Sequence, residues 1–306
     1  MRAIRINEWG KPVELEDIPQ PIPGDDEVLV RIHAASINPF DVAVVAGYLS
    51  FMATAPLTVG TDFAGEVVEV GKDVTNLKPG DEVYGMVVLH SGTFAEYATP
   101  KAHEVALKPK SLDYVQAAAV PLAATAAWQT LFDVAKLQGS ERLLIQGVGG
   151  SVGTYALQLA KSAGAYVYGT DIPERAELVK KLGIDCYVNH KVERVEDVAK
   201  DVDVVLDLVG GNAMEQSYNV LKPSGRYVTT LVMQPPQDEA ERRGIHSFGF
   251  GAQSKAELLT KFAELIDNDK LQVFINRTFP LEQAQEAMEF RGKTPIPGKV
   301  VLNIIP

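Results

Sequence analysis

Cysteine is almost absent from this sequence: Cys186 is the only one among 306 residues. One thiol cannot form a disulfide within the chain, and it cannot supply the several thiolates of a structural zinc site. The residues that follow it, Tyr187 and Val188, favour a β-strand. We therefore interpret Cys186 as a small core residue.

Positive charge and long apolar runs are also lacking. Lys and Arg number 29 against 40 Asp and Glu, and the formal net charge is −11. A nucleic-acid-binding surface needs clustered Lys and Arg, so no nucleic-acid partner is expected. No apolar run reaches the roughly 18 residues of a membrane-spanning helix, and the N-terminal MRAIRINEWG contains no apolar signal core. We expect a cytoplasmic protein without a membrane partner.

The first 110 residues have the pattern of a small β-barrel. Segments that alternate between apolar and polar residues, as half-buried strands do, are separated by stretches rich in Gly and Pro. The expected strands are residues 1–7, 13–18, 27–36, 62–70, 80–85 and 91–97.

Beyond Leu112 the pattern changes to helix and then to alternating strands and helices. Residues 113–132 are rich in Ala and lack Gly, which favours helix, and Pro121 breaks this segment or starts a new helix. Strands are expected at 142–146, 165–169, 186–188, 202–209, 226–232 and 247–251, with helices between them. This order predicts an α/β fold, a doubly wound parallel Rossmann sheet with helices on both faces.

The final apolar segment, residues 298–305, is a strand with no partner in such a sheet. We therefore place it with the β-rich part, which makes the doubly wound domain an insertion. The expected domains are 1–115 plus 274–306 for the β-rich part and 116–273 for the dinucleotide-binding part.

Residues 141–171 have the pattern of a dinucleotide-binding unit. A short apolar strand is followed by a glycine-rich turn, a helix, a second strand and an acid, Asp171. Glycine lets a pyrophosphate approach the backbone, and the free N–H groups of the first helical turn bind its charge. A tight strand-to-helix turn without a ligand is the alternative. The residues expected to bind the cofactor here are Gly147, Gly149, Gly150, Ser151, Val152 and Gly153.

The spacing departs from a strict G-x-G-x-x-G, because Gly153 follows Gly149 by four residues. A side chain at Gly150 or Gly153 would occupy space that the pyrophosphate or the contact between helix and strand needs. Valine at either position is expected to abolish cofactor binding and to leave the fold largely intact.

Several segments in a fixed order resemble the medium-chain dehydrogenase/reductase superfamily, most closely its zinc-free, zeta-crystallin-like quinone oxidoreductase branch. They cover nearly the whole chain and read AASINPFD at 34–41, VGTDFAGEVVEVG at 59–71, KPGDEVYG at 78–85, VPLAATAAWQTL at 120–131, QGVGGSVGTYALQLAK at 146–161 and GKVVL at 298–302. Together they are specific for the superfamily but specify no substrate. The resemblance implies a GroES-like β-barrel catalytic domain and a Rossmann domain that binds NAD(P)H.

The branch is identified by missing zinc ligands. Zinc-bearing members of the superfamily place a cysteine where this chain has Asn38 and a histidine where it has Thr61. Their structural zinc lobe needs four cysteines, which one cysteine cannot supply. The resemblance therefore implies no bound metal.

The resemblance implies three residues near the reacting atoms. Asn38 and Asp41 match the N-x-x-D motif near the nicotinamide, where Asn38 donates to a substrate carbonyl and Asp41 orients local backbone. Tyr48 matches a position that lines the substrate cleft, where a phenol stacks on a planar ring or donates a proton. The alternatives are a turn role for Asn38 before Pro39, and a partly buried Tyr48 without a role.

Three further residues are implied to approach the cofactor. Thr125 matches a residue at the nicotinamide end, and His190 lies where NADPH-dependent members carry a tyrosine near the adenosine phosphate. Lys299 opens the closing strand and is placed to face the cofactor phosphates. The alternatives are helix packing for Thr125, a surface histidine, and a solvated lysine, which is favoured for Lys299.

Asp171 and Arg175 favour different cofactors. Asp171 follows the glycine-rich turn at close to the separation of roughly 20 residues at which an acid binds the ribose hydroxyls of NAD(H). A carboxylate there repels the 2′-phosphate of NADP(H), whereas Arg175 can pair with it. Members that prefer NADPH usually have small or basic residues after this strand, so NADH is weakly favoured.

The leading interpretation is a zinc-independent NAD(P)H oxidoreductase that transfers hydride to a quinone, an enone or a similar electron-poor small molecule. An enoyl-thioester reductase is a second interpretation, and a nucleotide-binding sensor or structural protein without turnover is a third. Residues 247–251 (SFGFG) predict an edge strand of the doubly wound sheet. Open edges pair with copies of themselves, so a homodimer is expected.

Overall fold

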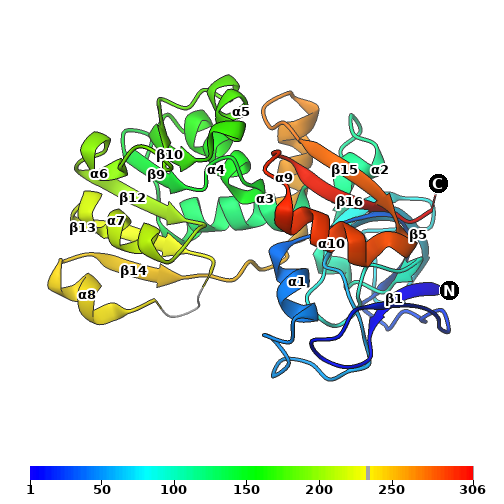
Figure 1. The fold of residues 1–306 in the computed structure, drawn as a ribbon. Helices are drawn as coiled ribbons and strands as arrows, with labels where there is room; N and C mark the ends of the chain where they lie inside the picture. The colour runs from blue at the N-terminus through cyan, green and yellow to red at the C-terminus, as the bar shows by residue number, and fades with distance from the viewer. Residues whose placement is uncertain (232–234, 306) are drawn as a thin grey trace. The chain divides into compact units, whose positions relative to one another are not determined.

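The computed structural model describes residues 1–231 and 235–305, and Figure 1 shows the ribbon. The chain forms two compact units. The β-rich unit contains Met1–Leu122, Ser254–Thr294 and the chain from Gly298 onward, and the doubly wound unit contains Ala123–Gln253 and Pro295–Pro297. Within the described ranges, no helix has both the length and the apolar character needed to cross a membrane.

The strands of the β-rich unit pair antiparallel, apart from a parallel pair formed by the last two. The strands are β1 (Arg2–Ile6), β2 (Glu14–Asp17), β3 (Val28–Ser36), β4 (Leu57–Thr58), β5 (Asp62–Val70), β6 (Glu82–Met86), β7 (Tyr97–Ala98), β8 (Val105–Leu107), β15 (Ile275–Pro280) and β16 (Lys299–Asn303). The main sheet has the order β15-β16-β3-β5-β6-β8, with β7 also paired to β3, and a smaller sheet has the order β2-β1-β4. The helices are α1 (Pro39–Val45), α2 (Tyr114–Ala118), α9 (Ala256–Asp267) and α10 (Ala284–Lys293).

Alternation of apolar residues explains the core of this unit. The side chains of Val28, Val30 and Ile32 point to one face of β3 and are buried in a single apolar cluster. The predicted final strand, β16, pairs antiparallel with β3, at Val301↔Ser36. The start of β16 therefore lies beside the end of β3, where several polar side chains of the candidate site are located.

The doubly wound unit contains a six-stranded parallel sheet with the order β11-β10-β9-β12-β13-β14. Its strands are β9 (Arg142–Gln146), β10 (Tyr166–Asp171), β11 (Cys186–Asn189), β12 (Val202–Asp207), β13 (Leu221–Thr229) and β14 (His246–Gly249). Its helices are α3 (Pro121–Trp128, which begins in the β-rich unit), α4 (Ser151–Ser162), α5 (Ala176–Lys181), α6 (Val195–Val198), α7 (Asn212–Val220) and α8 (Gln237–Arg242).

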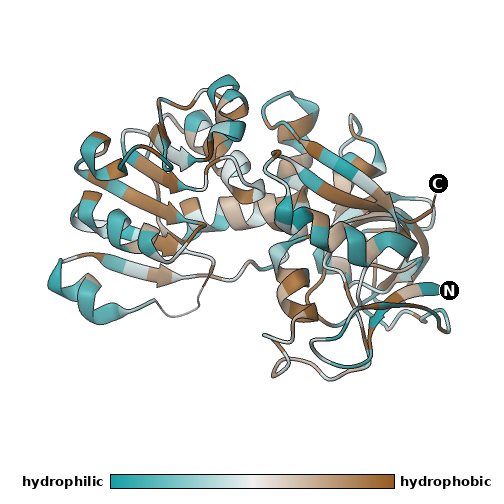
Figure 2. Ribbon diagram, in the orientation of Figure 1, coloured by the Kyte–Doolittle hydropathy of each residue, from teal (hydrophilic) through white to brown (hydrophobic). Residues whose placement is uncertain are grey.

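Helices cover both faces of this sheet. The β9–α4–β10 crossover moves towards one edge and the β12–α7–β13 crossover moves towards the other. Right-handed crossovers that move in opposite directions place their helices on opposite faces. All six residues of β12 are buried. Figure 2 shows the hydrophobic character of the strands at the centre of the sheet. The predicted doubly wound fold is confirmed.

The helix α9 packs in the β-rich unit, whereas the sequence pattern places residues up to 273 in the doubly wound part. The buried hydroxyl of Tyr84, in β6, donates to the carbonyl of Leu259 at 2.6 Å. An amphipathic pattern shows that one face of a helix is buried, but not against which sheet. The chain therefore returns to the β-rich unit at Ser254, well before residue 274.

Other differences follow from weak patterns. The strand β15 is not predicted because the central residues Asn276, Arg277 and Thr278 are polar and partly or fully exposed. The strand expected at 91–97 is reduced to the short β7. The expected end of β13, Val232, lies outside the described residues.

Candidate active site

The glycine-rich turn joins β9 to α4 and is held against β10. Gly147 has a φ of +80°, which lets the chain turn sharply out of β9. The N–H groups of Gly147 and Val148 donate to the carbonyl of Thr170 at 3.0 and 3.1 Å. The N–H of Gly149 donates to Oδ2 of Asp171 at 2.7 Å. The end of β10 therefore fixes the turn at two points.

The start of α4 presents unpaired donors. Gly150 is the N-cap, and in the described part of the chain the N–H groups of Ser151, Val152 and Gly153 have no acceptor. A Cβ on Gly150 would meet only the carbonyl oxygen of Gly147, at 3.3 Å, so the space beside Gly150 is open. Open space and unpaired N–H groups at a helix N-terminus fit a pyrophosphate.

Gly149 and Gly153 serve the turn itself. A Cβ on Gly153 would lie 2.4 Å from the carbonyl oxygen of Gly147 and 2.5 Å from that of Val148. A Cβ on Gly149 would lie 2.7 Å from Cβ of Arg175. Both glycines therefore keep the turn compact, whereas a side chain on Gly150 would project into open space.

The carboxylate of Asp171 is buried beside this turn, where the sequence places the ribose-binding acid. Besides Gly149, it accepts the N–H of Ile172 at 2.8 Å, and Nη1 of Arg175 lies 3.4 Å from Oδ1. Arg175 also donates from Nε to the carbonyl of Pro295 at 3.0 Å. A carboxylate has about four lone-pair sites, so three donors leave one acceptor position for a ribose hydroxyl.

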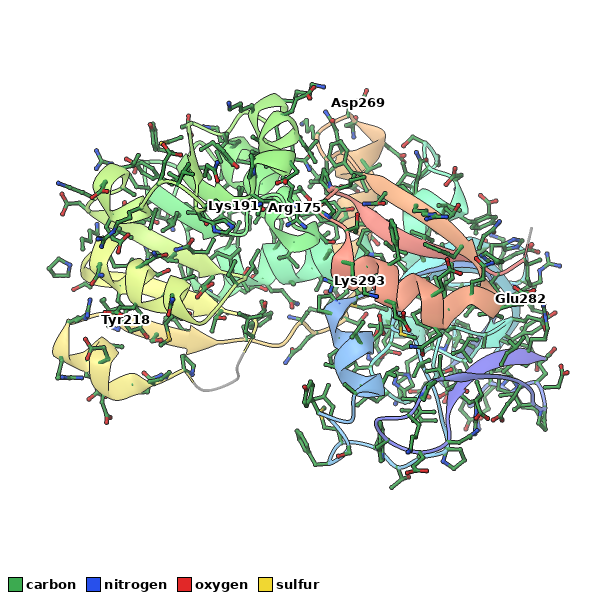
Figure 3. All side chains as sticks on the ribbon, viewed as in Figure 1. Arg175, Lys191, Tyr218, Asp269, Glu282 and Lys293 are labelled. Carbon is green, nitrogen blue, oxygen red and sulfur yellow. The ribbon has the colours of Figure 1, made fainter. Side chains whose placement is uncertain are left out.

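His190 lies at the same end of the sheet. Its main-chain N–H donates to the carbonyl of Asp171 at 3.3 Å, and the hydroxyl of Tyr187 donates to the same carbonyl at 3.0 Å. The side chain of His190 is exposed. Figure 3 labels the neighbouring Lys191 and Arg175 in this region. Sequence reasoning missed Tyr187, whose position in a strand gave no sign of this contact.

Thr125 lies in α3, within the doubly wound unit, and has no exposed surface. Among the described residues its hydroxyl has no hydrogen-bond partner. Buried hydroxyls are nearly always paired, so an unpaired one fits a position where a ligand supplies the partner. Its role at the nicotinamide end stays a prediction.

Lys299, Asn38 and Asp62 form a buried polar network in the β-rich unit. Nζ of Lys299 donates to Oδ1 of Asn38 at 2.5 Å and lies 3.4 Å from Oδ2 of Asp62. Asn38 donates from Nδ2 to the same Asp62 oxygen at 2.9 Å, and the hydroxyl of Ser36 donates to it at 2.7 Å. The adjacent strands β16, β3 and β5 contribute Lys299, Ser36 and Asp62, so the pairing of these strands assembles the network.

Lys299 is not a solvated residue. Its relative exposure is 3%, and burial lowers the pKa of its ammonium group, although the nearby Asp62 and Asp41 oppose this shift. The favoured alternative of a solvated lysine is therefore wrong. The ammonium group is directed at Asn38 and Asp62, and a contact with cofactor phosphates stays a prediction.

Asp41 caps the start of α1. It accepts the hydroxyl of Thr61 at 2.6 Å and the N–H of Asn38 at 2.7 Å. Its carboxylate is buried, and this burial raises the pKa of Asp41 to about 6, against the opposing effect of its two hydrogen bonds. The expectation that Asp41 orients local backbone agrees with these contacts.

The amide of Asn38 is fully engaged in this arrangement. Its oxygen faces the ammonium group of Lys299, and its NH₂ faces Asp62 and, at 3.4 Å, the carbonyl of Ser36. The opposite orientation would direct NH₂ at the ammonium group, so the contacts fix the amide. A substrate carbonyl would therefore have to displace one of these acceptors. Sequence reasoning missed Asp62, the acceptor at the centre of the network.

This donor set does not fit a catalytic zinc ion. Asn38 and Thr61 offer an amide and a hydroxyl, whereas zinc sites in proteins use thiolate, imidazole and carboxylate ligands. The ammonium group of Lys299 would also repel a divalent cation. Within the described ranges, no three His, Cys, Asp or Glu residues are grouped so that they could hold a metal ion.

Tyr48 lies in the loop after α1 and is 78% exposed, which differs from the partly buried alternative. Phe51 in the same loop is 81% exposed, and Met52 is 50% exposed. Exposed aromatic rings with an adjacent thioether can pack on a planar apolar molecule. A role of Tyr48 in substrate binding stays a prediction.

Asp41→Asn is expected to remove a pH dependence of stability near pH 6. The pKa of Asp41 is about 6 in the folded protein, above the value of about 3.9 in an unfolded chain. The folded state therefore takes up a proton as the pH falls, and the contribution of Asp41 to the free energy of unfolding rises by about 1 kcal/mol between pH 7 and pH 5. Chemical unfolding at both pH values measures this rise. Asp197→Asn, which alters an exposed carboxylate, should keep this rise. A rise of the same size in Asp41→Asn would contradict the assignment of the pH dependence to Asp41.

Comparisons with known proteins agree with this geometry. Residues 24–110 match the family described as "Alcohol dehydrogenase GroES-like domain", and residues 182–302 match the one described as "Zinc-binding dehydrogenase". The chain is similar to the human protein named "NAD(P)H oxidoreductase RTN4IP1, mitochondrial", with 35% identity over 92% of this chain and 82% of that protein. It is also similar to "NADPH-dependent alkenal/one oxidoreductase, chloroplastic" of Arabidopsis thaliana, with 34% identity over 92% of this chain and 73% of that protein.

Solved structures extend the similarity to the whole fold. The quinone oxidoreductase from Coxiella burnetii superposes with a TM-score of 0.93 at 31% identity, over 100% of this chain and 99% of that chain. The Escherichia coli quinone oxidoreductase complexed with NADPH superposes with a TM-score of 0.91 at 26% identity, over 100% of both chains.

Proposed function

We infer the reaction from family membership: the chain belongs to the medium-chain dehydrogenase/reductase superfamily, in its quinone oxidoreductase-like branch, and is an NAD(P)H-dependent oxidoreductase. We propose that it transfers hydride to quinones, enones or alkenals. The observation that carries this function is the glycine turn between β9 and α4, with its open space at Gly150 and its unpaired N–H groups. The relatives named for quinones and for alkenals support the substrate class.

The residues of the chain supply binding and orientation. The N–H groups of Ser151 to Gly153 would hold the pyrophosphate, and Asp171 would accept a ribose hydroxyl. When bound, the reduced nicotinamide supplies the hydride. We propose that Asn38 and Asp41 position the start of α1, and with it the loop that carries Tyr48 to the substrate.

A panel of acceptors tests the reaction. NAD(P)H oxidation should be rapid with quinones, enones and alkenals, should be absent with saturated ketones, and should persist when a metal chelator is added. Binding of cofactor without oxidation by any member would instead support a nucleotide-binding protein without turnover.

An enoyl thioester in the same panel tests a second candidate. The CurK enoyl reductase superposes on this chain with a TM-score of 0.91 at 26% identity. A kcat/KM for the thioester above those for all quinones and simple enones would favour this candidate.

We propose that the enzyme prefers NADH over NADPH because Asp171 is buried beside the glycine turn. A carboxylate near the 2′ position repels a phosphate dianion. Arg175 opposes this preference, and the Escherichia coli relative forms a complex with NADPH. Asp171→Ser should shift the ratio of kcat/KM values towards NADPH by at least about tenfold, or 1.4 kcal/mol.

Two further variants control for loss of structure. Asp171→Asn removes the charge but can still accept the N–H of Gly149, so it should shift the ratio in the same direction. Asp197→Ser removes an exposed carboxylate on α6 and should leave the ratio unchanged. A preference for NADPH in the wild type that Asp171→Ser leaves unchanged would show that this carboxylate does not face the ribose.

We also propose a homodimer formed through β14. Among the described residues β14 pairs only with β13, so its other edge is open, and Phe248 on it is 38% exposed. Light scattering at micromolar concentrations should give twice the mass of the chain, and a monomer would contradict the proposal. A cytoplasmic location stays a prediction, which cell fractionation can test.

A further inference from the structure

The parallel sheet reverses its strand order between β9 and β12. The chain passes from β9 to β10 on one side, and β12 pairs with β9 on the other, at Asp207↔Gln146. In open α/β sheets, ligands bind outside the carboxyl ends of the strands at such a point. Two turns therefore border the cofactor crevice: the glycine turn after β9, and residues 208–211 after β12, here named the 208–211 turn.

A buried carboxylate holds the 208–211 turn. Oδ1 of Asp207 accepts the N–H groups of Val209 and Gly210, both at 2.9 Å. The hydroxyl of Tyr227, in the adjacent strand β13, donates to Oδ2 of Asp207 at 2.7 Å. The relative exposures of Asp207 and Tyr227 are 0% and 1%. Neither residue is therefore placed to react with a substrate.

The 208–211 turn lies against the glycine turn. A Cβ on Gly147 would lie 3.0 Å from Cγ2 of Val209, and the N–H of Leu208 donates to the carbonyl of Gln146 at 3.2 Å. Val209 is 58% exposed. Gly210 has a φ of +74°, and a glycine does not by itself restrict the backbone of this turn to one conformation. The hydrogen bonds to Asp207 are what select its conformation.

We propose that Asp207 and Tyr227 are positioning residues for NAD(P)H, because they hold the 208–211 turn as the second wall of the cofactor crevice. The proposal rests on the proposed function only in that NAD(P)H is the cofactor, and it does not depend on the acceptor. Without the Tyr227 hydroxyl, Asp207 loses one of its three donors and can rotate away from Val209 and Gly210. Binding must then order the turn, which lowers the affinity.

The variant Tyr227→Phe tests this proposal, with Tyr218→Phe as a matched control. Tyr218 lies in α7, is labelled in Figure 3 and is 3% exposed. Its ring packs edge-on against that of Tyr227, with 5.1 Å between the ring centroids. Its hydroxyl lies 3.0 Å from Oγ of Ser247. Both variants remove one buried hydroxyl from the same cluster, but only Tyr227 contacts Asp207.

The readouts are the Kd of NAD(P)H by fluorescence titration and the Tm of the cofactor-free protein. We expect Tyr227→Phe to raise Kd and the cofactor KM about fivefold or more, since a hydrogen bond to a charged group is lost. Both variants should lower Tm by similar amounts. Tyr218→Phe should leave Kd within about twofold of wild type. Asp207→Ala, where it folds, should raise Kd further.

An unchanged Kd in Tyr227→Phe would overturn the proposal, as would an equal rise in Tyr218→Phe. A wild-type protein that binds neither cofactor would overturn the cofactor assignment itself, and the proposal with it. A normal Kd in the wild type without turnover on any acceptor would contradict only the proposed substrate class.

Discussion

Replacing Gly150 with valine is expected to abolish NAD(P)H binding while the protein stays folded. The backbone of Gly150 has a φ of −75°, which any residue adopts, and an added Cβ would meet only one atom, at 3.3 Å. The valine methyl groups would instead fill the open space where a pyrophosphate approaches the start of α4. The Kd should rise about a hundredfold or more, equivalent to about 2.7 kcal/mol. Fluorescence titration measures Kd, and Tm reports the fold.

Two other glycines make the comparison specific. Gly292→Val adds a side chain where nothing lies within 4 Å, in the β-rich unit, and should leave Kd unchanged. Gly153→Val places Cβ 2.4 Å from the carbonyl oxygen of Gly147, so it should also disturb the turn and lower Tm. The expectation that valine at Gly153 leaves the fold intact is therefore corrected. Unchanged affinity in Gly150→Val would place the cofactor elsewhere.

Replacing Lys299 with methionine is expected to destabilise the β-rich unit strongly. The ammonium group is buried between Asn38 and Asp62, and its removal leaves the carboxylate of Asp62 buried without its cation. Breaking such a pair by removing one partner typically costs about 3–5 kcal/mol. Chemical unfolding measures the change in the free energy of unfolding.

A double variant and a matched lysine control this result. Lys299→Met combined with Asp62→Asn removes both charges and should recover a large part of the loss. Lys293→Met alters an exposed lysine, with a side-chain exposure of 79%, and should change stability by less than about 0.5 kcal/mol. A loss below about 1 kcal/mol for Lys299→Met would contradict a charged, buried pair.

The doubly wound sheet could be predicted because its signals are local. The apolar run of β12 and the glycines after β9 each lie within a few consecutive residues. The position of Asp171 beside the glycine turn follows from the same pattern, since parallel strands end at one edge of the sheet. The partner of α9 could not be predicted, because its pattern shows only which face is apolar.

The buried network could not be predicted from sequence. Lys299 and Asn38 are 261 residues apart, and only the pairing of β16 with β3 brings them together. Asp62 looks like one more polar residue at the start of a strand, and nothing local shows that it is completely buried. Lys299 likewise looks like an ordinary surface lysine. Whether residues at such positions are buried depends on the order of the strands in the sheet. That order depends on residues that are far apart in the chain.

The transfer of deuterium from labelled cofactor tests the central claim most directly. The claim is that NAD(P)H held at the glycine turn delivers hydride to an electron-poor acceptor. With NAD(P)H deuterated at C4 of the nicotinamide and a simple enone as acceptor, mass spectrometry should find one deuterium at the β-carbon of the saturated product. The same reaction with Gly150→Val should give no product. A wild-type enzyme that forms no deuterated product from either cofactor labelled on either face, or a variant that forms as much as the wild type, would contradict the account.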